Sequence, residues 1–234
     1  MGIGGPAGVA IFPAMADGLF ITGGTGYLGS RLIPLLVSRG HSVTAFVRRG
    51  SESGIPPGAA AVAGDPLDTA SLRAALPGHR TWVQLIGTPR PAPWKAARFR
   101  AVDLRAAQAM AESVAGSEVR HLVYLSVARP APVMAAYVSV RAQAESALRA
   151  TGIPCTFLRP WYVLGPGHRW PYALLPVYAL LERIPSAREG ALRLGLVTLD
   201  RMLSALVHAI ENPPPALRIL DVPAIRGLPP LPPR

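Results

Sequence analysis

The chain has 234 residues, of which 50% are hydrophobic and 16% are charged. This composition excludes a disordered chain and leaves room for one large α/β domain whose core needs no disulfide bonds. The net charge of +11 comes almost entirely from arginine, because Lys95 is the only lysine. Since the arginines are scattered singly, we expect no sequence-specific binding of nucleic acid, while peripheral contact with an anionic membrane surface stays open.

The cysteine content and the apolar stretches bear on the compartment. Cys155, the only cysteine, lies in an apolar run that predicts a buried strand, so nothing points to an oxidising compartment. Residues 1–17 have no Lys or Arg ahead of their apolar stretch, unlike a secretory signal, and we expect a disordered extension there. The longest apolar stretch elsewhere, residues 171–181, is shorter than the roughly 20 residues that cross a bilayer. We therefore predict a cytoplasmic protein without a transmembrane helix.

Short apolar runs alternate with longer stretches of helical periodicity, which is the pattern of parallel βαβ units. Strands are predicted over residues 19–22, 42–47, 60–64, 82–86, 121–126 and 155–158. Helices are predicted over residues 27–39, 69–76, 95–115 and 134–151. Gly40 is a stop signal after the first helix, and Asp68 or Thr69 is a cap before the second. We expect strands buried on both faces of a doubly wound parallel sheet, the Rossmann fold of the α/β class.

The pattern changes after Pro160. The sequence then predicts an apolar helix, a short apolar run, a second helix and a last strand, over residues 172–181, 192–197, 199–210 and 217–222. Because this part is too short for an autonomous domain, we expect a small C-terminal lid, from about residue 160, on the carboxyl edge of the sheet. The predicted domain spans residues 18–222, and residues 223–234 form a proline-rich tail.

A glycine-rich segment, residues 22–29, follows the first predicted strand and opens the first helix. Gly23 permits a tight turn, Gly26 lets a pyrophosphate approach the backbone, and Gly29 lets the helix pack closely on the strand. The N–H groups and the positive dipole end of the helix then face the phosphates. In this context the segment predicts a dinucleotide site. The intervening residues belong to the same site: Thr25, Tyr27 and Leu28.

The end of the second predicted strand bears on the choice between the two nicotinamide dinucleotides. An NAD site usually has an acid there for the ribose 2′-hydroxyl, whereas this chain has Arg48 and Arg49. Two arginines bind a 2′-phosphate through forked, charge-assisted hydrogen bonds, which favours NADP(H) over NAD(H). The alternative is two solvated loop arginines. At the end of the third strand, Gly64 and Asp65 form a turn whose acid is placed to accept a hydrogen bond from the adenine amino group.

These motifs resemble the atypical, extended-like branch of the short-chain dehydrogenase/reductase superfamily, which includes NmrA-like sensors and NAD-dependent epimerase/dehydratase-like enzymes. The resemblance covers about residues 18–222 and rests on the glycine spacing and the Gly64 turn. It also rests on three later segments, residues 124–126, 158–167 and 197–200. It implies that Ser126 is the family's catalytic serine and that Pro160 belongs to the cofactor site.

The catalytic pair departs from the family pattern. The resemblance implies a tyrosine and a lysine four residues apart on a helix, with the ammonium holding the ribose and lowering the pKa of the phenol. This chain has Tyr137, eleven residues after Ser126, and then Arg141. Arginine keeps the charge but is bulkier and cannot release a proton. Hence two hypotheses stay open: an oxidoreductase of the short-chain type, or a non-catalytic redox sensor or assembly subunit that binds the dinucleotide without turnover.

The remaining candidate features concern the substrate and metals. For Tyr137 and Ser126 the alternative roles are helix packing and an ordinary strand end. Five aromatic residues in the predicted lid either line a pocket for a small hydrophobic or carbonyl substrate, such as a quinone, or only pack the lid. They are Trp161, Tyr162, Trp170, Tyr172 and Tyr178. The five histidines have no His or Cys neighbour at metal-ligand spacing, so no metal is predicted.

Overall fold

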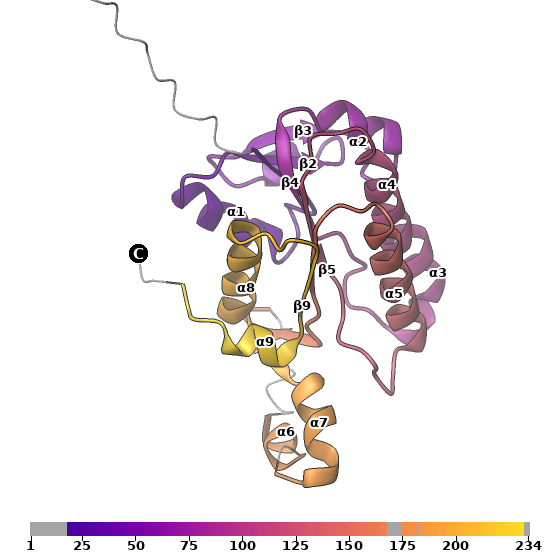
Figure 1. Ribbon diagram of the computed structural model, residues 1–234, viewed down its shortest axis with the longest axis vertical. Coiled ribbons are helices and arrows are strands. Elements are labelled where there is room, and N and C mark those ends of the chain that lie inside the picture. Colours follow the sequence, from indigo (N-terminus) through magenta and orange to yellow (C-terminus); the bar gives the residue numbers. More distant parts are fainter. Residues whose placement is uncertain (1–17, 168–174, 182, 232–234) are drawn as a thin grey trace, which may run out of the picture.

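The computed structural model describes residues 18–167, 175–181 and 183–231 and contains a seven-stranded sheet whose neighbouring strands are all parallel (Figure 1). The strand order is β3-β2-β1-β4-β5-β6-β9. The strands are β1 Gly18–Thr22, β2 Val43–Val47, β3 Ala60–Ala63, β4 His79–Gln84, β5 His121–Leu125, β6 Cys155–Leu158 and β9 Leu217–Leu220. Because the order reverses between β1 and β4, the predicted doubly wound α/β fold is confirmed.

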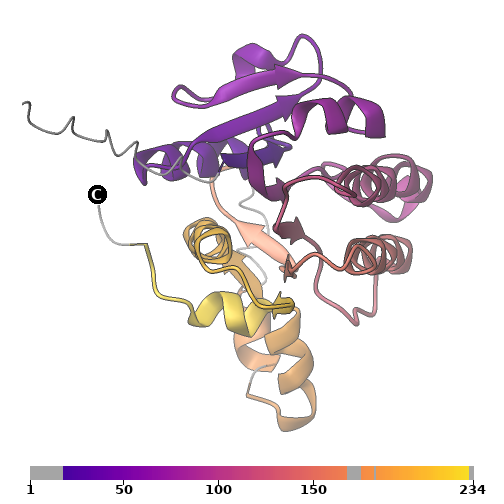
Figure 2. The ribbon, with the colours of Figure 1, turned by 45° about the horizontal axis from the view of Figure 1, so that its top comes forward.

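Helices cover both faces of the sheet (Figures 1 and 2). One face carries α1 Gly29–Ser38, α8 Leu199–Glu211 and α9 Val222–Gly227. The other carries α2 Thr69–Ala75, α5 Ala135–Arg149 and, between them, one continuous helix. That helix consists of α3 Ala96–Arg98, the π-helical stretch η3 Phe99–Leu104, and α4 Arg105–Ser113. Two apolar clusters, one on each side of the sheet, form the core.

Local signals in the sequence explain where these elements begin and end. Asp68 caps α2, since its carboxylate accepts a hydrogen bond from the Ser71 amide at 2.8 Å. Gly40 follows α1 with a φ of +85°, a left-handed conformation that glycine adopts at little cost. Within the first 158 residues of the chain, each predicted strand and helix has an observed counterpart in the described part.

β4 is displaced from its predicted position, residues 82–86. It begins at His79 and ends at Gln84, after a register irregularity beside Gly18. The Leu85 amide still donates to the Thr22 carbonyl, at 2.9 Å, but the Ile86 amide donates to the side chain of Gln84 instead. The ladder therefore stops two residues earlier than the apolar pattern indicates. β3 also differs from expectation, because this Ala-rich edge strand is exposed along its length.

The C-terminal part contains more helix than predicted. A small parallel sheet is formed by β7 Tyr162–Leu164 and β8 Leu196–Thr198. Between these two strands the chain forms α6 Leu175–Leu181 and α7 Pro185–Arg193. These two helices project from the body of the molecule (Figure 1). Neither α7 nor α9 was predicted, and α9 occupies the start of the segment expected to be a tail. Both helices are short and begin next to a proline at N1 or N2, a position that suits the first turn of a helix.

Cys155 opens β6 and is 1% exposed, as its apolar run predicts. In the described part of the chain, no helix combines the length and apolar character needed to cross a membrane.

The buried histidine at the start of β5 predicts a loss of stability in mild acid. His121 donates or accepts one hydrogen bond with the Thr156 hydroxyl, at 2.9 Å, while its Nδ1 is buried without a partner among the described residues. Burial, with a smaller effect of Arg218, lowers the pKa of His121 to about 4. The unfolded chain, with an ordinary histidine pKa of about 6.5, binds the extra proton first, so stability present above pH 6.5 is lost towards pH 4. We expect the free energy of unfolding to fall by roughly 2 kcal/mol from this residue between pH 7.5 and pH 5.

Urea titrations at the two pH values measure this change. His121→Gln should show a smaller pH dependence, and His208→Gln, at a half-buried position on α8, serves as the matched control. An unchanged pH dependence in His121→Gln would contradict the assignment.

The single thiol is predicted to be unreactive in the native protein. Burial raises the pKa of Cys155 to about 11, and its Sγ lies 3.1 Å from the Ile153 carbonyl oxygen. At pH 8 only about one molecule in a thousand then carries the nucleophilic thiolate. We expect labelling by a disulfide reagent to be at least about a hundredfold slower in buffer than in guanidinium chloride. Equal rates in the two conditions would show that the strand opens readily.

Candidate functional site

The glycine-rich loop lies at the point where the strand order reverses. β1 ends at Thr22 and β4 lies beside it, while the connections after these strands lead to opposite faces of the sheet. Gly23 has a φ of +84°, and a Cβ there would lie only 2.8 Å from the Leu85 carbonyl carbon. In open α/β sheets this crevice at the carboxyl ends of the strands is where ligands bind.

The three glycines of the motif have separate roles in this loop. A Cβ at Gly29 would lie 2.4 Å from the Gly23 carbonyl oxygen, so α1 can start against the turn only without a side chain there. Gly26, in contrast, is exposed, and a Cβ there would meet only the Gly23 carbonyl oxygen, at 3.1 Å. Gly23 and Gly29 thus shape the protein, whereas Gly26 leaves open space on the solvent side. That space fits a phosphate group approaching the backbone.

The first turn of α1 is electrostatically suited to an anion. No side chain caps this helix, and its first turn contains no acidic residue. Arg31 lies here as well, with its guanidinium 4.3 Å from the centre of the Tyr27 ring and its Nη1 donating to the Tyr27 carbonyl at 2.8 Å. The Tyr27 hydroxyl reaches Gly165, where a Cβ would lie 2.3 Å away. Tyr27 therefore connects the glycine-rich loop to the end of β7.

Arg48 and Arg49 directly follow β2 and are both exposed. Their side chains make no hydrogen bond or ion pair with any residue that the structure describes. The loop they begin packs on the glycine-rich loop, because a Cβ at Gly54 would lie 3.2 Å from Thr25 Cγ2 and one at Gly24 3.1 Å from Ile55 Cδ1. The structure thus packs this loop on the glycine-rich loop and leaves both arginine side chains exposed.

The chain bends at Gly64, directly after β3. A Cβ at Gly64 would lie 2.3 Å from Phe46 Cζ, so no larger residue fits. Asp65 is exposed, and its Oδ1 accepts a hydrogen bond from the Leu67 amide at 2.9 Å. Within the described chain its other oxygen has no hydrogen bond, and it is therefore available to a ligand.

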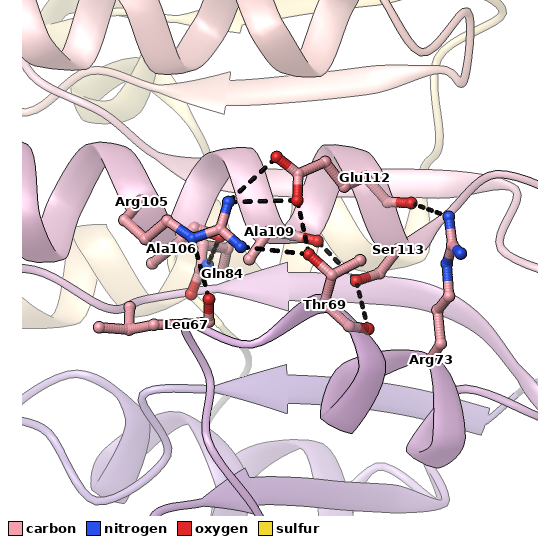
Figure 3. Close-up of polar contacts among 9 residues, drawn as sticks. All are labelled: Leu67, Thr69, Arg73, Gln84, Arg105, Ala106, Ala109, Glu112 and Ser113. Atoms are coloured by element: carbon pink, nitrogen blue, oxygen red, sulfur yellow. Dashed lines mark hydrogen bonds and ion pairs between the residues drawn. The ribbon is translucent and has the colours of Figure 1, made fainter.

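A polar network fixes this turn to the neighbouring helix (Figure 3). Arg105 of α4 donates to the Leu67 carbonyl, at 3.0 Å, and to both carboxylate oxygens of Glu112, at 3.0 and 3.1 Å. The Thr69 hydroxyl donates to Glu112 at 2.5 Å, and Arg73 donates to the Glu112 carbonyl at 2.6 Å. The hydrogen bond from Thr69, followed by that from Arg105, lowers the pKa of Glu112. The network therefore holds the start of α2, and with it the Asp65 turn, in place.

Arg141 is 2% exposed and belongs to a buried polar cluster behind the carboxyl ends of β4 and β5. Its Nη2 donates to Asp103 at 2.7 Å, and its Nη1 donates to the Tyr124 hydroxyl at 3.0 Å and the Leu125 carbonyl at 2.8 Å. Asp103 also accepts from the amide and the hydroxyl of Thr88. Burial lowers the pKa of Arg141, but Tyr124, Tyr137 and Asp103 raise it more, so the pKa lies above its ordinary value.

Gly87 separates this guanidinium from the solvent side. Gly87 is exposed, yet a Cβ there would lie 2.5 Å from Arg141 Nη2. The arginine therefore lies directly behind the backbone of the loop after β4, where its hydrogen bonds go to protein groups. The contact of this cation with a ribose stays a prediction.

Tyr137 is half-buried on the first turns of α5. Its ring packs on Phe99, with ring centroids 4.9 Å apart, and lies 5.2 Å from the Arg141 guanidinium carbon. Its hydroxyl has no hydrogen bond to any residue in the described ranges. The phenol group is thus oriented by packing on the π-helical stretch and remains available to a ligand.

Ser126 lies immediately after β5, and its hydroxyl is bonded to a buried acid. It donates to Glu145 at 2.6 Å, and Glu145 also pairs with Arg129 and Arg159, both partly exposed. In the described chain no hydrogen bond joins Ser126 to Tyr137. The buried Pro160 carbonyl accepts from the Ala128 amide at 3.0 Å, which ties the loops after β5 and β6 together.

The sequence did not indicate the partners that engage these side chains. Asp103 and Glu145 occur in helices of ordinary composition, and only the fold brings them to Arg141 and Ser126. The one available signal was Asp103 itself, an acid among alanines in a predicted helix, and the structure buries it.

Three of the five aromatic residues predicted in the lid are among the described residues. Trp161, Tyr162 and Tyr178 are half-buried, while Trp170 and Tyr172 lie outside the described residues. The described ranges contain no group of three or more His, Cys, Asp or Glu residues that could hold a metal ion.

Known proteins share the family and the fold of this chain. A family model described as NAD(P)H-binding matches residues 23–170. A ceramide reductase of Caulobacter vibrioides is 24% identical over 198 residues, which are 82% of this chain and 61% of that protein. The chain thus spans about three fifths of the length of this curated relative.

Solved structures share the fold. WbmH of Bordetella bronchiseptica, in complex with NAD+, has a TM-score of 0.66 and 18% identity, over 88% of this chain and 76% of its own. UDP-N-acetylglucosamine 4-epimerase of Bacillus cereus has a TM-score of 0.66 and 15% identity, over 88% and 79%. The family model covers well over half of the chain, from the glycine-rich loop past the Gly165 segment, and the chain therefore belongs to the NAD(P)H-binding family.

Proposed function

We propose that this protein is an NADP(H)-dependent oxidoreductase of the short-chain type that acts on a carbonyl or quinone-like substrate. The observation that carries the cofactor choice is the pair of exposed, unpartnered arginines, Arg48 and Arg49, beside the glycine-rich loop. Two positive charges that form no ion pair with the described residues suit a 2′-phosphate, and the strand end lacks the acid that usually binds the NAD ribose.

The chain's own residues would hold the cofactor at three places. The amides at the start of α1 and the open space at Gly26 receive the diphosphate, the arginines after β2 receive the 2′-phosphate, and Asp65 accepts from the adenine amino group. When bound, the coenzyme supplies or accepts the hydride. Tyr137, whose hydroxyl is free and whose ring is fixed by Phe99, is the group placed to donate a proton to a carbonyl oxygen or to remove one from an alcohol.

Arg141 has a different role in this proposal from that of the family's lysine. Its guanidinium is fixed by Asp103, Tyr124 and Leu125, so it orients the Tyr137 ring from behind instead of binding the ribose. Ser126 is likewise engaged by Glu145. The reductase name of the curated relative supports hydride transfer to a carbonyl, whereas these two engaged side chains support the second candidate, a dinucleotide-binding sensor or assembly subunit without turnover.

The cofactor proposal predicts a selective loss of affinity. Arg48→Ala should weaken NADPH binding by roughly tenfold to a hundredfold, because a charge-assisted hydrogen bond contributes about 1.5 to 3 kcal/mol. NADH binding should change less than about twofold, since its ribose lacks the phosphate. Isothermal titration calorimetry with both coenzymes measures the two affinities. Arg120→Ala, an exposed arginine near the amino ends of the strands, is the control. Equal losses for NADPH and NADH would contradict the proposed phosphate contact.

The catalytic proposal predicts that the phenol hydroxyl of Tyr137 is needed for turnover. Tyr137→Phe keeps the ring packing on Phe99 and should lower kcat with NADPH and a carbonyl or quinone substrate by about a hundredfold or more, with unchanged NADPH affinity. Stopped-flow absorbance of NADPH oxidation gives the rate. If the parent protein binds NADPH tightly and turns over no substrate in a broad screen, the non-catalytic candidate replaces the enzyme.

A further inference from the structure

We propose that the carboxyl edge of the sheet docks on the surface of an anionic phospholipid bilayer. The docking face consists of three segments: residues 89–100, residues 127–134, and residues 175–181 with 183–193. It adjoins the dinucleotide site but does not rest on the proposed redox chemistry, because its evidence is the distribution of exposed apolar and cationic side chains.

The three segments of the docking face lie next to one another. They follow β4, β5 and β7, at the end of the molecule from which α6 and α7 project (Figure 1). The first contains the 3-10 turn η2 Pro93–Lys95, which contacts α5, the helix that directly follows the second segment. The third is tied to the second, because Arg193 Nε donates to the Pro130 carbonyl at 3.1 Å. One continuous surface results.

Large apolar side chains are exposed on each segment of this face. Trp94 is 82% exposed, Val133 56%, Leu180 59% and Ile184 40%. Leu180 and Ile184 flank the turn between α6 and α7. The end of α7 leads into β8 in the body, so this turn lies at the outer end of the projecting helices. Elsewhere in the described chain, exposed large apolar side chains occur only on the edge strands β3 and β9: Val62, Leu217 and Ile219.

The same segments hold a large share of the positive charge. They contain eight cationic residues and one acidic residue, and with Glu182, which interrupts the third segment in the sequence, the net charge is +6 of the chain's +11. Five of the arginines are exposed and make no side-chain hydrogen bond or ion pair with the described residues. They are Arg90, Arg98, Arg100, Arg183 and Arg188.

The mixture of the two side-chain types points to a bilayer as the partner. Cations near an anionic leaflet gain electrostatic energy, while tryptophan and aliphatic side chains enter the interface below the headgroups. A nucleic acid would use the charges but would leave Val133, Leu180 and Ile184 in water. The docking face therefore fits anionic lipid better than another polyanion.

Vesicle flotation with the full chain, without coenzyme, tests the proposal. We expect binding to phosphatidylcholine vesicles that contain about one third phosphatidylglycerol and at least about tenfold weaker binding to pure phosphatidylcholine. Arg98→Glu with Arg183→Glu, and separately Trp94→Ser with Leu180→Ser, should each lower the partition coefficient about tenfold or more. These positions are exposed, so the variants should keep the stability of the parent.

Matched variants away from the face separate docking from general charge and hydrophobicity. Arg120→Glu with Arg149→Glu changes the net charge by the same amount, and Val62→Ser with Ile219→Ser removes similar exposed apolar area; both should bind like the parent. Loss in the charge control, or full binding by the Trp94 and Leu180 variant, would overturn the proposal in favour of nonspecific polyanion attraction. Because NADPH affinity is measured separately, a failure of the cofactor proposal leaves this result unaffected.

Discussion

The approach of the β1–α1 turn to the end of β4 is the constraint on which the candidate site depends. Gly23 takes a left-handed conformation with no room for a Cβ, and Gly29 lets the helix begin against the same turn. Together they bring the positive end of α1 to the crevice where the strand order reverses. A side chain at either position would push the helix away from the sheet, and the loops after β2 and β3 would then lose the surface on which they pack.

The groups suited to binding a coenzyme and the groups expected to be catalytic differ in their exposure and in their hydrogen bonds. The groups suited to a dinucleotide are exposed and unpartnered, as at Arg48, Gly26 and one oxygen of Asp65. The groups expected to be catalytic are mostly engaged: Arg141 by Asp103 and Ser126 by Glu145. Of the three side chains expected to be catalytic, Tyr137 alone combines a fixed ring with a hydroxyl that has no hydrogen bond within the described residues. In the function proposed above, such a site binds its coenzyme with the backbone and loops, and one phenol group transfers the proton.

The sequence predicted most of the fold because periodicity, glycine and caps are local signals. The glycine spacing, Asp68 before α2 and Gly40 after α1 each describe a few neighbouring residues, and the structure confirms their geometry. The end of β4 could not be predicted, because it depends on the Gln84 side chain capturing an amide. The partners of Arg141 and Ser126 could not be predicted either, because Asp103 and Glu145 are distant from them in the sequence and belong to no motif. Helices α7 and α9 were missed because their apolar patterns are short.

The buried cluster around Arg141 also limits how this chain can change. A lysine at the same position would bring one ammonium where a planar guanidinium now serves Asp103, Tyr124 and Leu125 along separate directions. Asp103 would keep its hydrogen bonds from Thr88, but the Leu125 carbonyl or the Tyr124 hydroxyl, if left without a donor in this interior, would cost about 1 to 3 kcal/mol. The arginine is thus held by its neighbours, and a lysine in its place would require compensating changes among them.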